Sequence, residues 1–320
     1  MKINESKVVV FSSHARTGGP ELLHQLVYQL ELNGKNSYIC YYPFDKRHII
    51  HNEYLKYKTP VCDFKDDGDT FFVIPESATF ITKMITRSRY SIWWLSVDNY
   101  FRVKGDSLLR DFIYTCLSLL RSRVPIKNLK NALHFTQSEY AKKFLKLRGM
   151  DSSMLTDYLG LEHTSKERFI DLKNKKDIIV YNPKKGAKTT RELVKYFKKF
   201  NFIPIQDMSS IEVASLLESA KIYIDFGNHP GKDRLPREAA LSGCCIITNT
   251  KGSAENSVDI CISKKYKLDE KSDLFYDKFD LIIEGIFTNF EIHLKDFDKY
   301  RLRIASEEKT FQAQVKKIFL

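Results

Sequence analysis

Residues 8–42 have the sequence VVVFSSHARTGGPELLHQLVYQLELNGKNSYICYY, in which a strand, a glycine-rich turn, a helix and a second strand follow one another. The apolar run 8–12 is typical of a parallel strand buried on both faces. Leucine and valine recur at three- and four-residue steps over 21–32, which predicts a helix that ends at Asn33-Gly34. Residues 37–42 predict the second strand. This order of elements is one βαβ crossover unit.

The same alternation continues along the chain, pauses, and then restarts. Further strands are predicted at 70–75, 91–97, 132–137, 177–181, 202–205, 221–226 and 244–248, and further helices at 108–120, 139–147, 189–200, 212–219 and 236–241. The polar region 157–176 lacks an apolar period and marks a domain boundary. We therefore predict an α/β protein with two doubly wound, Rossmann-like domains, residues 1–160 and 161–290, followed by a helical tail, 291–320.

Charge narrows the class of partner. The chain has 52 basic and 40 acidic residues, a net charge of +12, which favours nucleic acid, anionic lipid or phosphorylated small molecules. The longest stretch without a charge, residues 239–250, is shorter than the ~20 residues of a membrane-spanning helix. The first residues lack the pattern of a signal peptide, and the cysteines form no C-x-x-C pair. We expect a cytoplasmic, reduced protein without a transmembrane segment.

Ligands of open parallel sheets bind at the carboxyl ends of the strands, so the loops there hold the candidate residues. Gly18 and Gly19 allow close approach of a ligand to the backbone at a helix start; the alternative is a tight turn without a ligand. Lys184 and Lys185 precede another helix start, where cations favour a phosphate. The alternative there is a solvated basic loop.

The loop 227–238 has the highest density of such features. Lys232 and Arg234 are placed to bind a diphosphate, and Glu238 to accept hydrogen bonds from a ribose. A helix start with surface charges would explain Glu238 but not the whole pattern. Asp98 follows the strand with both tryptophans, where it is either a general base with a raised pKa or a capping residue.

No metal site is expected from the sequence. The histidines form no H-x-x-x-H or H-E-x-x-H pattern. Two Asp-x-Asp pairs, at 67–69 and 296–298, lie before a strand and in the polar tail, and we interpret both as solvated turns. A serine-hydrolase Gly-x-Ser-x-Gly elbow is also missing.

These segments resemble the two-domain glycosyltransferases of the GT-B type, especially the large bacterial group with a Gly-Gly-x-Glu loop near the start. Gly18-Gly19-Pro20-Glu21 is similar to that loop, and residues 136–140, TQSEY, resemble a segment near the end of the acceptor domain. Lys185-Gly186 is similar to the Lys-Gly of the donor domain. Residues 237–248, REAALSGCCIIT, resemble the Glu-Ala-x-x-x-Gly-x-Pro-Val-Ile segment, which is the most specific of these motifs.

The resemblance implies two Rossmann-like domains that face each other across a cleft, with the tail 291–320 returning to the first. It implies that Lys185 contacts the diphosphate of a nucleotide-sugar donor and that Glu238 holds its ribose, with no metal cofactor. The strand end 206–208 places Met208 beside the nucleotide base of the donor. Pro230 stands where retaining members usually have a second glutamate, so retention and inversion both stay open.

If the reaction is inverting, Asp98 or His14 is the candidate general base that accepts the proton of the acceptor hydroxyl. The expected function is transfer of a sugar to a glycan or polyprenyl-linked acceptor in bacterial surface polysaccharide synthesis, such as O-antigen or capsule. The predicted helix 108–120 has basic edges, which suits either an anionic membrane surface, on the inner face of the cytoplasmic membrane, or an ordinary core position.

Two alternatives from other classes remain. A sugar-nucleotide epimerase uses the same two-domain plan on a free nucleotide sugar. A nucleic-acid-binding protein would use the positive charge, but the basic residues are dispersed and no recognition motif is present, so we expect no nucleic-acid partner.

Overall fold

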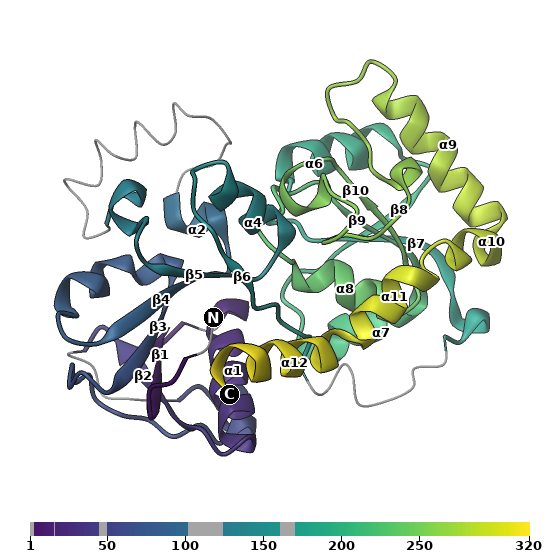
Figure 1. Ribbon diagram of the computed structural model, residues 1–320. Coiled ribbons are helices and arrows are strands. Elements are labelled where there is room, and N and C mark those ends of the chain that lie inside the picture. Colours follow the sequence, from purple (N-terminus) through teal and green to yellow (C-terminus); the bar gives the residue numbers. More distant parts are fainter. Residues whose placement is uncertain (1–2, 16, 45–49, 102–123, 161–169) are drawn as a thin grey trace. The chain divides into compact units, whose positions relative to one another are not determined.

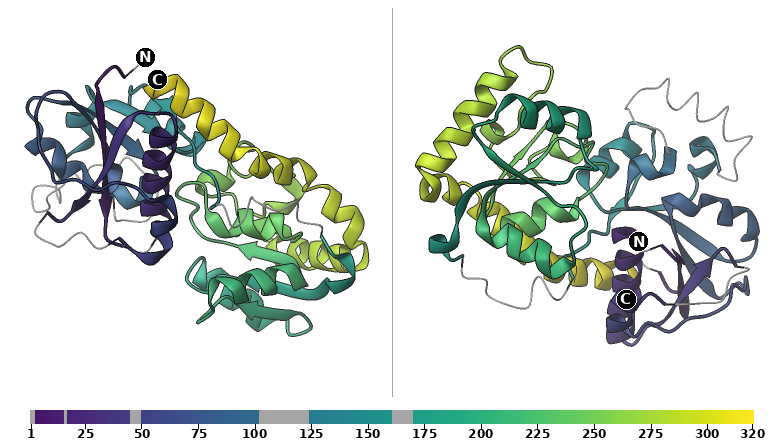
Figure 2. Two further views of the ribbon diagram at one scale, coloured as in Figure 1. Left: turned by 90° about the horizontal axis from the view of Figure 1, so that it is seen from below. Right: turned by 180° about the vertical axis from the view of Figure 1, so that it is seen from behind.

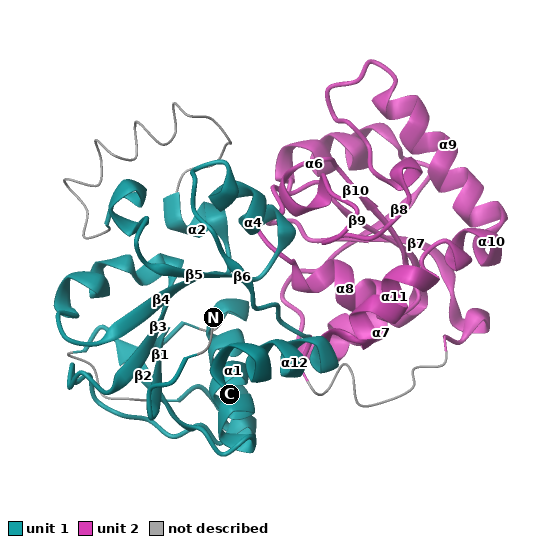
Figure 3. Ribbon diagram, viewed as in Figure 1, with its two compact units in different colours: residues 1–158, 308–320 teal, residues 159–307 magenta. Residues whose placement is uncertain are grey.

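The structure, a computed structural model, describes residues 3–15, 17–44, 50–101, 124–160 and 170–320. The chain forms two compact units, each with its own sheet (Figure 3). Unit 1 comprises residues 1–158 and 308–320, and unit 2 comprises residues 159–307.

Unit 1 is built on a six-stranded sheet in the order β2-β1-β3-β4-β5-β6, and all neighbouring strands are parallel (Figure 1). Its strands are β1 Lys7–Ser13, β2 Asn36–Tyr42, β3 Thr70–Pro75, β4 Arg89–Trp94, β5 Leu133–Thr136 and β6 Ser153–Met154. Because the strands are parallel, the loops that follow them gather along one edge of the sheet.

Helices cover both faces of this sheet, which is why residues 8–11 of β1 are all apolar. Val8 and Val10 pack with α1 on one face, while Val9 and Phe11 pack on the other. The helices are α1 Gly18–Leu32, α2 Val97–Phe101, α4 Glu139–Lys146 and most of α12 Glu307–Phe319, with 3-10 turns at Asn52–Tyr57, Glu76–Met84 and Ile126–Leu129. The predicted helix 108–120 lies outside the described residues.

Unit 2 is built on a four-stranded sheet in the order β10-β9-β7-β8, again with all neighbours parallel. Its strands are β7 Lys176–Tyr181, β8 Asn201–Pro204, β9 Ala220–Asp225 and β10 Cys245–Thr248. Its helices are α6 Ala187–Tyr196, α7 Ser210–Ser219, α8 Arg234–Leu241, α9 Phe275–Thr288, α10 Phe290–Lys295 and α11 Asp298–Ala305, with 3-10 turns at Leu172–Asn174, Gly252–Ala254 and Lys264–Tyr266. The predicted α/β class with two parallel sheets is confirmed.

The polar tail is a series of helices rather than one. Helices α10 and α11 belong to unit 2, and from residue 308 onward the chain belongs to unit 1. There Phe311 and Val315 join the core that contains α1. The amide of Ile3 donates to the carbonyl of Ile318 at 2.9 Å, so the two ends of the chain lie together (Figure 2).

Helix α9 is absent from the sequence prediction, although its buried residues Phe275, Phe279, Ile283 and Ile286 recur at helical spacing. They complete the core against β9 and its neighbours. Among the described residues, no helix has the length and apolar character that crossing a membrane requires.

Candidate functional site

The loop between β9 and α8 begins at a buried carboxylate. Asp225, the last residue of β9, is 2% exposed. One of its oxygens accepts the amide of Gly227 at 2.9 Å, and the other accepts the hydroxyl of Tyr223 at 3.2 Å. These two bonds fix how the chain leaves the sheet.

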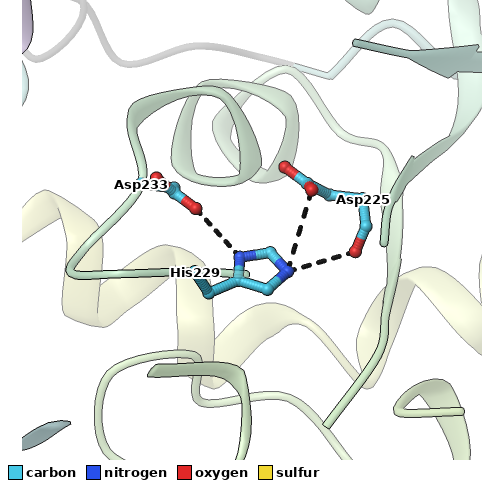
Figure 4. A group of neighbouring side chains, drawn as sticks. All are labelled: Asp225, His229 and Asp233. Atoms are coloured by element: carbon cyan, nitrogen blue, oxygen red, sulfur yellow. Dashed lines mark hydrogen bonds and ion pairs between the residues drawn. The ribbon is translucent and has the colours of Figure 1, made fainter. Parts of the chain in front are cut away.

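His229 lies at the centre of this loop, between two aspartates (Figure 4). Its Nδ1 is 2.9 Å from Asp233 Oδ2, and its Nε2 is 3.1 Å from the Asp225 carbonyl oxygen and 3.8 Å from Asp225 Oδ1. A carbonyl and a carboxylate only accept hydrogen bonds, so both ring nitrogens must donate and the ring is an imidazolium. Burial lowers the pKa of His229, but Asp225 and Asp233 outweigh it and the pKa is raised.

The backbone of the loop is fixed from the adjacent turn. His229 has a φ of 47°, a left-handed conformation that is costly for most residues. Its carbonyl accepts the amide of Ser253 at 2.8 Å. Gly252 has a φ of 57°, and a Cβ on it would lie 2.2 Å from the carbonyl oxygens of Asn228 and His229. Only glycine allows this close approach of the two loops.

The loop after β7 contributes Lys185 to the same cluster. Lys185 Nζ is 2.6 Å from Asp233 Oδ1, so that carboxylate bridges Lys185 and His229. The two loops pack closely at Gly186. A Cβ on this residue would lie 2.5 Å from the backbone of Phe226. Burial lowers the pKa of Lys185, but Asp233 and Asp225 outweigh it and the pKa is raised. Lys184 beside it is exposed.

Two more of the predicted cations have carboxylate partners in unit 2. Arg234 forms an ion pair with Glu238 one turn along α8. Lys232 Nζ is 2.6 Å from Glu307 Oε1, and Arg237 Nη1 is 2.7 Å from Glu307 Oε2. The side chains of Lys232 and Glu307 are only 7% and 6% exposed, which makes this pair part of the interior. Thus the structure brings Lys185, Lys232, Arg234 and Glu238 together around one loop.

The start of α8 is not capped by the residue in the capping position. Asp233 occupies the N-cap, where an aspartate commonly accepts amide hydrogen bonds, but its side chain makes none to the helix. Instead it binds His229 and Lys185. The sequence prediction assigned no role to Asp225, His229, Asp233 or Glu307. The spacing of four residues from Asp225 to His229 to Asp233 marks the first three, and no sequence signal marks Glu307.

Proximity alone would allow Asp225, His229 and Asp233 to hold a metal ion, since one ligand atom from each lies within 4.8 Å of the others. The hydrogen bonding does not fit this role. A metal ligand histidine needs a free lone pair, whereas both nitrogens of His229 donate. The ammonium of Lys185 already neutralises Asp233 and would repel a divalent cation.

The loop after β1 holds the predicted glycines of unit 1. Gly18 and Gly19 are the first residues of α1. A Cβ on Gly18 would meet nothing within 4 Å, and one on Gly19 would make only an ordinary contact with Leu95 at 3.9 Å. Neither the packing nor the backbone therefore requires glycine there, in contrast to Gly186 and Gly252.

His14, at the end of β1, stacks on Tyr41 with ring centroids 4.7 Å apart. Its Nε2 is buried and has no hydrogen-bond partner among the described residues. Tyr41 in turn bonds His24 Nε2 at 2.9 Å, and His24 Nδ1 bonds Thr59 at 2.7 Å. Burial lowers the pKa of His24 to about 4, so it is neutral.

Asp98 and Met208 lie at two other strand ends. Asp98 is in the first turn of α2, which follows β4 in unit 1, and its side chain is partly buried. Met208 is 37% exposed, in the loop between β8 and α7 of unit 2. The preceding residue, Asp207, has a φ of 54°.

Comparison with known proteins gives a clear result for the fold. No family model matches the chain. Anabaena HepE, solved in complex with UDP-glucose, aligns with a TM-score of 0.64 over 97% of this chain and 98% of its own, at 10% identity. The lipopolysaccharide outer core galactosyltransferase WaaB aligns with a TM-score of 0.61 over 97% and 99%, at 12% identity. Sucrose-phosphate synthase of Thermosynechococcus elongatus scores 0.57 over 98% and 95%, at 9% identity.

A sequence match of another kind covers part of the chain. The tRNA (guanine-N(7)-)-methyltransferase of Clostridium botulinum strain 657 is 30% identical over 155 residues, 47% of this chain and 67% of that protein. This alignment spans less than half of the chain, whereas the structural matches include both units.

The chain is therefore a two-domain α/β protein with the GT-B fold. Within that fold, nearly all of the chain aligns with HepE and with the galactosyltransferase WaaB. The predicted resemblance to GT-B glycosyltransferases is confirmed.

Proposed function

We propose that this protein is a glycosyltransferase that moves a sugar from a nucleotide-diphosphate donor to an acceptor hydroxyl. The observation that carries the proposal is the cluster of cations and carboxylates at the carboxyl ends of β7 and β9 in unit 2. That edge is where an open parallel sheet binds its ligand. The GT-B fold, and the UDP-glucose bound to the similar HepE, support a nucleotide sugar as that ligand.

The donor residues divide by chemistry. Lys185 keeps 32% of its side chain exposed beside Asp233, so its ammonium is accessible to a phosphate. Glu238 offers carboxylate oxygens to the ribose hydroxyls, with Arg234 holding that carboxylate in place. Lys184, Met208 and the glycines Gly18 and Gly19 are proposed to line the path of the donor. Lys232, bound to Glu307, supports the loop from inside.

The proposed reaction breaks the bond between the anomeric carbon and the diphosphate oxygen and forms one to the acceptor oxygen. Negative charge builds up on the leaving diphosphate, and Lys185 and Arg234 are proposed to stabilise it without a metal. The acceptor hydroxyl loses its proton to a base, for which His14 and Asp98 are the candidates in unit 1 if the configuration is inverted. The buried Nε2 of His14 has no hydrogen-bond partner among the described residues, which supports this role.

The acceptor is proposed to be a glycan or polyprenyl-linked glycan of bacterial surface polysaccharide synthesis. The protein would then work in the cytoplasm, at the inner face of the membrane. This part rests on the sequence resemblance and on the +12 charge, which suits an anionic surface. Binding to anionic liposomes that weakens at high salt is the expected result, and binding that ignores salt contradicts it.

A thermal-shift panel tests the donor proposal first. UDP, GDP, ADP, dTDP and their sugars are added to the protein, and the melting temperature should rise with one nucleotide and its sugars, because a ligand that binds only the native state stabilises it. Lys185→Ala should reduce that rise, and Glu238→Ala should abolish it. Incubation of the selected sugar without acceptor should leave its stereochemistry unchanged; conversion to another sugar indicates an epimerase instead.

A second candidate function is tRNA methylation, which the partial alignment with the methyltransferase favours. The positive net charge is compatible with a nucleic-acid substrate. S-adenosylmethionine belongs in the same thermal-shift panel for this reason. A shift with that molecule, methyl transfer to tRNA, and no response to any nucleotide sugar would replace our proposal with this one.

A further inference from the structure

We propose that His229 is a positioning residue for the donor diphosphate, which acts through Asp233 to fix the ammonium of Lys185. The proposal rests on the function proposed above, because it assigns Lys185 to the diphosphate. His229 itself is fully buried and is not proposed to touch the donor.

The link consists of two contacts on opposite oxygens of one carboxylate. His229 Nδ1 is 2.9 Å from Asp233 Oδ2, and Lys185 Nζ is 2.6 Å from Asp233 Oδ1. Because His229 holds one oxygen of Asp233 from the interior, the carboxylate has a fixed orientation. Its other oxygen then fixes the position of the Lys185 ammonium. Without His229, Asp233 would be free to rotate toward the start of α8, whose N-cap position it already occupies.

The environment of His229 differs from that of the other buried histidines. His134 accepts the indole N–H of Trp94 on Nδ1 at 3.1 Å and donates to the carbonyl of Leu129 from Nε2 at 3.0 Å, so it is a neutral ring. His24 binds two hydroxyl groups, which can donate or accept. Of these three, His229 alone lies between two acceptors. The ring of His229 therefore holds the Asp233 carboxylate from one side while its other nitrogen is anchored on the carbonyl of Asp225.

The test is a double-mutant cycle between His229 and Lys185. Asparagine replaces His229, because asparagine tolerates the left-handed backbone at that position and removes the charge. Isothermal titration with UDP, GDP, ADP and dTDP identifies the best nucleoside diphosphate for the wild type. Lys185→Ala should weaken it roughly 10- to 100-fold, the loss of one charge-assisted contact. His229→Asn should weaken the affinity for the diphosphate roughly tenfold, which is typical of the loss of a group that orients a binding residue.

The decisive measurement is His229→Asn in the Lys185→Ala background. If His229 acts through Lys185, the second substitution should then change the affinity less than twofold, since the group it positions is gone. A merely structural role would give the same loss in both backgrounds. His134→Asn is the matched control: it removes a buried histidine of unit 1 and should lower the melting temperature without changing diphosphate affinity.

The outcomes separate the two proposals. A wild-type protein that binds none of the four diphosphates contradicts the proposed function itself. A wild type that binds, with an unchanged affinity in His229→Asn or an equal loss in both backgrounds, overturns only the positioning role. An equal loss in His134→Asn also overturns it, because the effect would then be general. If His229→Asn does not fold, Asp233→Asn replaces it in the same cycle, with the same expected and contradictory results.

Discussion

The loops at the two candidate regions, after β1 in unit 1 and after β9 in unit 2, are built on opposite plans. In unit 2, Lys185, Lys232 and Arg234 are each paired with a carboxylate, and the glycines Gly186 and Gly252 are needed for the packing. In unit 1, the loop begins with His14, whose buried Nε2 has no partner among the described residues, and it leads to Gly18, which has open space around it.

This difference suggests that the two loops have different roles in the reaction. Paired charges in a packed loop are preorganised, so a ligand that binds there pays little to order them. An orphaned imidazole nitrogen costs stability in the free protein and is useful where a proton must be accepted. We therefore expect unit 2 to govern donor affinity and unit 1 to govern turnover, and the following predictions test that contrast.

The largest effect is expected on turnover from the candidate bases. His14→Ala or Asp98→Ala, whichever removes the base, should lower kcat roughly 10²- to 10⁴-fold and leave the donor-induced rise in melting temperature unchanged. Glu238→Ala serves as the opposite case and should remove that rise. Full activity in both His14→Ala and Asp98→Ala would show that neither residue is the base and that the contrast has no basis in unit 1.

The next largest effect concerns the interior of unit 2. Glu307→Gln leaves Lys232 and Arg237 buried without their shared carboxylate, so the free energy of unfolding should fall by roughly 3–5 kcal/mol. Glu308→Gln, at the next position but less buried, is the matched control and should change it by less than about 0.5 kcal/mol. Urea unfolding measures both. Similar stability of the two variants would contradict the buried network.

The sequence was sufficient to predict the two sheets but not this network. Alternating apolar runs and helix signals predict each main strand, because burial on both faces requires continuous apolar residues such as those of β1. Lys185 and Glu238 were found from motifs, and Arg234 from the cations gathered in the loop before α8. Glu307 and Lys232 are 75 positions apart in the numbering, and only the folded chain brings them together. His229 was missed although Asp225 and Asp233 stand four residues before and after it, because only the folded loop shows that both of its ring nitrogens face acceptors.

Buried histidines of the two units should give opposite pH dependence. Burial lowers the pKa of His134 in unit 1 to about 4, so the unfolded state binds a proton at a higher pH than the folded state does. The free energy of unfolding should therefore fall by roughly 3 kcal/mol as the pH drops from 6.5 toward 4. Burial also lowers the pKa of His229 in unit 2, but Asp225 and Asp233 outweigh it. Because its folded pKa is raised, its contribution is complete below 6.5 and is lost as pH rises through the folded pKa.

Urea unfolding at a series of pH values separates these two slopes. His134→Asn should flatten the loss of stability on the acid side, and His229→Asn should flatten the loss on the alkaline side. The same alkaline slope in wild type and His229→Asn would mean that His229 is not charged in the native protein.

The smallest effects are expected from one pair of glycine substitutions. Gly252→Ala places a methyl group 2.2 Å from two carbonyl oxygens at a residue with a left-handed backbone. The free energy of unfolding should fall by at least about 1–3 kcal/mol, which is the cost of one strained residue. Gly18→Ala meets nothing within 4 Å and should leave the unfolding free energy within about 0.5 kcal/mol. If Gly18 is open because a ligand approaches its backbone, the harmless methyl group should still weaken binding of donor or acceptor. Gly18→Ala with unchanged stability, unchanged KM for both substrates and unchanged kcat would show that no ligand approaches the backbone at Gly18, which would leave the role of unit 1 in the reaction to His14 and Asp98.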